Sequence, residues 1–213
     1  MNARLQQLAP PWAPLAATVA VLVTGTIARL VWHSDRLGGA DAWGVRELEA
    51  TSSAVLLAAR IVSAGLLSLA LVGSLAVAAL AWVVLRWRKA VLLALAAPVL
   101  AVVAERLLKL VVERRVPEAE VSHYPSGHLA AGTAFALSLV LVVRRTGVAP
   151  AARTAVAVAA CLFVVVMGVA RVVESAHLLS DVVGGVATGV AATLVVALLL
   201  DHYLPDPNQE TNR

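Results

Sequence analysis

The chain has 213 residues, of which 61% are hydrophobic and 14% are charged. A soluble domain is about 45–50% apolar and about 25% charged, so this composition excludes an ordinary water-soluble domain and indicates a membrane protein. The single cysteine, Cys161, excludes an internal disulfide framework and thiolate zinc clusters. The formal charge of +4 does not indicate a nucleic-acid partner, because the Lys and Arg residues form no long run and only punctuate apolar segments.

Apolar segments of membrane-spanning length recur along the whole chain. Crossing a hydrocarbon core takes roughly 20 apolar residues in a helix. The sequence therefore predicts an all-α polytopic protein, with one six-helix membrane domain over residues 1–213. The expected helices cover about 15–32, 54–85, 90–112, 127–143, 154–173 and 178–200. In the last of them Gly185 and Gly189 predict close helix packing, and residues 201–213 predict a short disordered cytoplasmic tail.

The short loops predict the orientation of the chain in the membrane. Segments 86–89 and 144–153 each contain three Lys or Arg residues and no acid. Segment 33–49 instead has four acids against two arginines. Lys and Arg of short loops accumulate on the cytoplasmic side, so we expect a plasma-membrane protein with both termini in the cytoplasm and segment 33–49 outside.

Polar clusters stand at the ends of three apolar segments, where charges are costly and need a reason. They lie within residues 105–115, 123–128 and 171–181. Lys109 and His128 are 19 residues apart without a full crossing, so they lie at the same face. His128 and His177 are 49 residues apart with two apolar segments between them, so the chain crosses and returns. We therefore expect all three clusters at one extracytoplasmic level.

The spacing inside the clusters predicts a particular chemistry. His177 and Asp181 are four residues apart, so the carboxylate can orient one ring nitrogen and leave the other as a nucleophile. Ser126 and Gly127 precede an apolar helix, whose free N–H groups favour a phosphate, and His128 lies in its first turn.

Four cationic side chains accompany these residues and suit an anionic phosphoryl group. They are Lys109, Arg114, Arg115 and Arg171. Interfacial cations often only reach towards lipid headgroups, and Glu105 is available to Lys109 as an i,i+4 partner. Two histidines, an orienting aspartate and four cations at one face are more organised than headgroup contact requires. No cluster resembles a carboxylate-rich Mg²⁺ site, so we expect no metal and no cofactor.

With these motifs the sequence resembles the bacterial integral-membrane lipid phosphatases of the type 2 phosphatidic acid phosphatase (PAP2) superfamily. That family has the motifs Lys-x6-Arg-Pro, Pro-Ser-Gly-His and Ser-Arg-x5-His-x3-Asp. The second motif is complete in residues 125–128, and the third matches from Arg171 to Asp181, with Ala170 in place of its serine.

The first motif is imperfect. Val116 occupies the arginine position seven residues after Lys109, followed by the matching Pro117. Arg115 or Arg114 is then the candidate for the missing guanidinium.

The resemblance implies a metal-independent mechanism. His177, held by Asp181, attacks phosphorus to give a phosphohistidine, and His128 protonates the leaving oxygen. The phosphoryl oxygens are then bound by Lys109, Arg115 or Arg114, Ser126, Gly127 and Arg171.

An interfacial site indicates a lipid substrate and the membrane itself as partners, with no nucleic acid. The candidates are phosphatidic acid, phosphatidylglycerol phosphate and a polyprenyl diphosphate such as undecaprenyl diphosphate. Segment 33–53, with Trp43, is the expected region of headgroup selection. Two alternatives stay open: a phosphotransferase with an alcohol acceptor, and a non-catalytic lipid-binding scaffold motivated by Val116 and Ala170.

Overall fold

The computed structural model describes residues 7–32, 38–48, 52–112, 114 and 124–204. Within these ranges the chain is all-helical, with seven α-helices. They are α1 (Ala13–Val31), α2 (Gly39–Leu48), α3 (Ser53–Val83), α4 (Arg88–Val112), α5 (Gly127–Arg144), α6 (Pro150–Val173) and α7 (Leu179–Tyr203). All except α2 are long and apolar enough to cross a membrane. The prediction of an all-α membrane protein with six spanning helices is confirmed.

Most helix boundaries agree with the expected ones to within a few residues, and the exceptions have local reasons. Helix α6 starts at Pro150, four residues earlier than expected, because proline at the first helical position has the right φ and needs no N–H partner. The expected tail begins at Asp201, whereas α7 continues to Tyr203. The rest of the tail, 205–213, lies outside the described residues.

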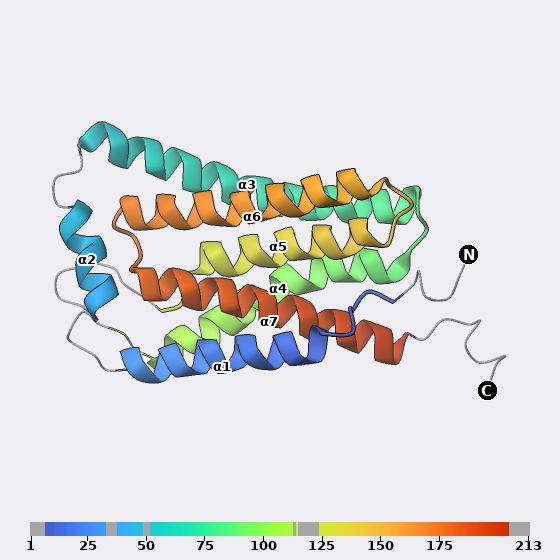
Figure 1. Ribbon diagram of the computed structural model, residues 1–213, viewed down its shortest axis with the longest axis horizontal. Coiled ribbons are helices and arrows are strands. Elements are labelled where there is room, and N and C mark those ends of the chain that lie inside the picture. Colours follow the sequence, from blue (N-terminus) through green and yellow to red (C-terminus); the bar gives the residue numbers. More distant parts are fainter. Residues whose placement is uncertain (1–6, 33–37, 49–51, 113, 115–123, 205–213) are drawn as a thin grey trace.

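Helix α2 is the one element that the sequence analysis does not predict. It lies within the segment expected to be an extracytoplasmic loop, and Figure 1 shows it across one end of the bundle, beside the starts of α3 and α7. The helix has 10 residues, too few to span a bilayer. It therefore covers one end of the bundle.

Helices α5 and α7 form the centre of the bundle. Helix α7 packs against α1, α4 and α5, and α5 also packs against α3 and α6. Small residues permit this close approach. A Cβ atom on Gly185 would lie 2.5 Å from the carbonyl oxygen of Ser126, and one on Gly189 would lie 2.5 Å from that of Ala130. The expected close packing at both glycines is confirmed, and it draws the starts of α5 and α7 together.

Tyr124 fixes the segment that leads into α5. Its side chain is 1% exposed and its hydroxyl donates to the carbonyl oxygen of Thr24 on α1 at 2.7 Å. A Cβ atom on Gly184 would clash with the ring. Burial raises the pKa of Tyr124 far above its ordinary value, so the hydroxyl stays protonated and remains a donor. The residues just before α5 are thereby held between α1 and α7.

The opposite end of the bundle is closed by Asp201. Its carboxylate accepts hydrogen bonds from the backbone N–H groups of Leu8 and Ala9, at 2.8 Å each, and pairs with Lys89 at 3.1 Å. The beginning of the described chain, the start of α4 and the end of α7 are therefore joined at one point. Figure 1 shows this end of the bundle opposite α2.

Candidate active site

The three polar clusters come together at the end of the bundle that carries α2. Lys109 lies in the last turn of α4, and Arg171 in the last turn of α6. His128 is the second residue of α5, while His177 lies two residues before the start of α7. Figure 1 shows that these four helix ends lie on the same side of the bundle. Residues separated by up to 68 positions in sequence thus occupy one level.

His177 and Asp181 face each other at the start of α7. The Nδ1 atom of His177 lies 3.6 Å from Oδ2 of Asp181, slightly beyond hydrogen-bond distance. The same Oδ2 accepts from the backbone N–H of Leu178 at 3.1 Å. Asp181 is completely buried and His177 is 8% exposed. Because Nδ1 faces the carboxylate, Nε2 is the ring nitrogen left for other chemistry.

Burial sets the protonation state of His177. It lowers the pKa below the ordinary 6.5, because removal from water disfavours the charged imidazolium. Asp181 opposes this shift, whereas the positive charges of Arg171 and Lys109 add to it. His177 is therefore neutral at neutral pH, as a nucleophile must be.

His128 occupies the first turn of α5 and is half-buried. It lies within electrostatic range of Arg171, His177 and Lys109. The two histidines and the two cations thus share one site.

The expected phosphate-binding cations Lys109 and Arg171 each have an acidic partner. Lys109 pairs with Glu105, one turn earlier on α4. Arg171 Nη1 lies 2.5 Å from Oε1 of Glu174, which also accepts from the hydroxyl of Ser63 on α3 at 2.9 Å. The side chain of Lys109 is 25% exposed and that of Arg171 is 14% exposed. The acids hold both cations at the site.

Ser126 and Gly127 form the start of α5. Ser126 is fully buried, and its backbone N–H donates to the carbonyl oxygen of Asp181 at 3.0 Å. Its hydroxyl has no hydrogen-bond partner among the described residues. A Cβ atom on Gly127 would lie 3.0 Å from the carboxylate of Glu105. The start of α5 is therefore attached to α7 on one side and packed against α4 on the other.

Arg114 has partners different from the expected phosphate. Its Nη1 donates to Oδ1 of Asp181 and to the hydroxyl of Ser180, both at 2.7 Å. Its Nη2 donates to Oδ2 of Asp41 at 2.7 Å, and the residue is 3% exposed. Both ends of its guanidinium thus bind carboxylates, and its role as a phosphate ligand stays a prediction. Arg115, the other candidate, lies outside the described residues.

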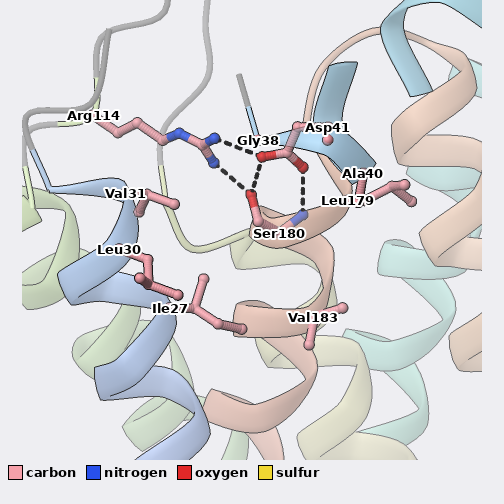
Figure 2. Close-up of a pocket in the computed structure, with 11 residues that line it drawn as sticks. Ile27, Leu30, Val31, Gly38, Ala40, Asp41, Arg114, Leu179, Ser180 and Val183 are labelled. Carbon is pink, nitrogen blue, oxygen red and sulfur yellow. Dashed lines mark hydrogen bonds and ion pairs between the residues drawn. The ribbon is translucent and has the colours of Figure 1, made fainter. Parts of the chain in front are cut away.

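An apolar groove of about 600 Å³ lies between the end of α1, α2 and the start of α7. Figure 2 shows Asp41, Arg114 and Ser180 bonded to one another at its polar end. Its apolar lining includes Ile27, Leu30, Val31, Leu179 and Val183. The groove adjoins the carboxylate network and not the histidines themselves.

Asp41 and Ser180 belong to the site, although no pattern in the sequence marks them as functional residues. Asp41 is one of several acids in a predicted loop, and only the position of α2 brings it to α7. The one sequence signal for Asp41 is that it is the only charged residue within 37–45. Ser180 stands beside Asp181 in the third cluster, but its spacing predicts no particular contact. In the described part of the chain, no three His, Cys, Asp or Glu side chains form a group that could hold a metal ion.

The arrangement suits attack on an anionic electrophile. A neutral imidazole backed by a carboxylate supplies a nucleophile. Nearby cations favour a negatively charged group and the charge that develops on it. His128 supplies a second titratable group for proton transfer.

A comparison with protein-family models agrees with this chemistry. No curated protein and no solved structure matches the chain. A family model described as the PAP2 superfamily matches residues 66–203, which include His128, His177 and Asp181. This family acts on phosphate esters as phosphatases or phosphotransferases. Because the match spans more than half of the chain, and six of its helices are of membrane-spanning length, the protein is a membrane-embedded member of the PAP2 superfamily.

Proposed function

We propose that the protein is a metal-independent phosphatase that removes the terminal phosphate of a membrane lipid phosphate or diphosphate. The observation that carries this proposal is the meeting of the His177–Asp181 pair, His128 and two cations at one end of a membrane bundle. Phosphatidic acid, phosphatidylglycerol phosphate and polyprenyl diphosphates all present a phosphoryl group at that level. The lipid class is supported by the position of the site at the ends of helices long and apolar enough to span a membrane.

The proposed mechanism has two steps. First, Nε2 of His177 forms a bond to phosphorus while the bond from phosphorus to the lipid oxygen breaks, and His128 gives that oxygen a proton. Second, His128 takes a proton from water, the water oxygen bonds to phosphorus, and the P–N electron pair returns to His177. The products are the dephosphorylated lipid and inorganic phosphate. Lys109 and Arg171, with Ser126 and Gly127 at the start of α5, bind the phosphoryl oxygens during both steps.

The test is phosphate release by the purified full chain in detergent containing EDTA. Substrates are phosphatidic acid, phosphatidylglycerol phosphate and a polyprenyl diphosphate, each with and without an added alcohol. Release that persists in EDTA supports the proposal. Transfer of phosphate to the alcohol in place of release indicates the phosphotransferase. Absence of both from every substrate contradicts an enzymatic role and favours the lipid-binding scaffold.

The site is proposed to face the extracytoplasmic side, with both termini in the cytoplasm. The support is the excess of basic residues at the opposite end of the bundle, where the α3–α4 and α5–α6 connections lie. The active enzyme then acts on lipids of the outer leaflet of the plasma membrane.

Cysteine labelling at two matched glycines tests this orientation. Gly38, beside α2, and Gly147, between α5 and α6, are exposed and have open space where a Cβ would stand. In a Cys161→Ala background, Gly38→Cys should react with a membrane-impermeant thiol reagent in intact cells or spheroplasts. Gly147→Cys should react only after lysis. The reverse pattern would place phosphate release in the cytoplasm.

A further inference from the structure

Asp41 connects α2 to the start of α7. Its Oδ1 accepts from the backbone N–H of Ser180 at 2.9 Å. Its Oδ2 accepts from the Ser180 hydroxyl and from Nη2 of Arg114, both at 2.7 Å. Asp41 is 5% exposed. One carboxylate thus caps the N-terminus of α7 from another helix and holds a guanidinium at the same time.

Arg114 connects this carboxylate to the one that faces the histidine. Its Nη1 binds Oδ1 of Asp181, the oxygen that His177 does not face. The other oxygen of Asp181 is bound by the N–H of Leu178. Both oxygens of Asp181 therefore have fixed donors, and the carboxylate presents one edge to the imidazole. The orientation of Asp181 depends on Arg114, and that of Arg114 depends on Asp41.

The network also places a charged group beside the histidine. Among the described residues, Arg114 pairs with both Asp41 and Asp181, and the second oxygen of Asp181 faces Nδ1 of His177. The imidazole gains positive charge when its Nε2 bonds to phosphorus. A fixed negative charge at Nδ1 stabilises that state more than the neutral ring.

Stability alone is a weak explanation for this arrangement. Buried ion pairs often contribute little net stability, because removing the charges from water costs as much as their attraction returns. Apolar side chains at the contact between α2 and α7 would close that end of the bundle without the cost of burying charges. What the ionic contact adds is a defined geometry and charge at Asp181.

We infer that Asp41 and Arg114 are positioning residues for the proposed phosphatase reaction, holding Asp181 in the orientation that directs His177 at phosphorus. Helix α2 is then part of the active site, although it contributes no group to the chemistry. The inference rests on the proposed function. It gives Arg114 a role other than binding phosphate.

The pH dependence of the reaction distinguishes positioning from a merely structural role. Besides Asp41 and Arg114, four groups act on His177 from the elements packed around it: Asp181 of α7, Arg171 of α6, Lys109 of α4 and His128 of α5. These four are unchanged in every variant below. A shift of the acid limb between variants therefore reports the effect of Asp41 or Arg114 on His177. The ionisation of the substrate is the same for every variant.

The experiment measures kcat, KM and the acid limb of kcat/KM for phosphate release by the full chain. Asp41→Asn keeps the shape of the side chain and should lower kcat by about 100-fold, as expected for a displaced reacting group, with KM little changed. Loss of a negative charge lowers the pKa of His177 further, so the acid limb should move to lower pH. Arg114→Gln removes a positive charge and should move it to higher pH. Arg114→Lys keeps the charge but loses the forked geometry, so kcat should fall without a shift.

Asp201→Asn is the matched control. Asp201 is a partly buried carboxylate that also binds backbone N–H groups and a cation, but at the opposite end of the bundle. Its replacement should lower thermal stability and leave the acid limb in place. An unshifted acid limb in Asp41→Asn overturns the inference, and so does a change confined to KM in Arg114→Lys, which would make Arg114 a phosphate ligand. An inactive wild-type protein instead contradicts the proposed function.

Discussion

His177→Ala should abolish phosphate release from lipid phosphates, with a loss in kcat of about 10⁶-fold, as expected when the group that forms the covalent bond is removed. The described site contains a second imidazole, His128, but no carboxylate backs it in the way that Asp181 backs His177. The measurements are phosphate release and the capture of labelled phosphoprotein after brief reaction with a radiolabelled lipid phosphate. Both should be lost together.

Asp181→Asn is the control that distinguishes loss of the nucleophile from loss of its orientation. The imidazole remains, so labelled phosphoprotein should still form, but far more slowly than in the wild type. Near-normal turnover in His177→Ala would exclude His177 as the nucleophile. Full-rate labelling in Asp181→Asn would show that the carboxylate has no orienting role.

His128→Ala should slow the reaction by different factors for substrates with different leaving groups. A lipid alkoxide needs a proton as it departs, and loss of the general acid should slow its release by about 10²- to 10⁴-fold. An activated aryl phosphate has a leaving oxygen that needs no proton. The first turnover of such a substrate, seen as a burst of phenolate, should be much less affected. Single-turnover rates for both substrates, in the wild type and the variant, make the comparison.

The second step gives an internal check on that assignment. His128 also deprotonates the attacking water, so the variant should accumulate phosphoprotein after the aryl burst. Equal losses in the first turnover with both substrates would contradict its role as the acid. Accumulation without a burst is impossible, so the two signals must appear together.

Much of the fold follows from patterns that are local in the sequence. The apolar segments predict six spanning helices because a bilayer leaves little alternative to a helix of that length. The pair Gly185 and Gly189 predicts contact because only small residues admit another helix so closely. Likewise, the i,i+4 spacing predicts that His177 faces Asp181. In each case the residues that determine the structure lie within one helical turn or one membrane-spanning segment of each other.

Contacts that depend on tertiary placement were beyond such patterns. Asp41 lies 139 residues before Ser180 in sequence, and nothing near it indicates a partner on α7. The motif spacing left Arg115, or else Arg114, as the candidate for binding phosphate. Only the side-chain directions in the folded chain show that Arg114 turns towards two carboxylates.

The contact of Asp201 with Leu8 and Ala9 has a consequence for biosynthesis. Leu8 and Ala9 lie 193 and 192 positions before Asp201, so the contact forms only after α7 has emerged from the ribosome and entered the bilayer. Until then α1 has no α7 to pack against, and the histidine that precedes α7 has no site to join. The candidate site is thus completed only when α7 joins the bundle. A chain that stops before α7 leaves five helices in the membrane, with the small-residue face of α5 open to lipid or to quality-control proteases.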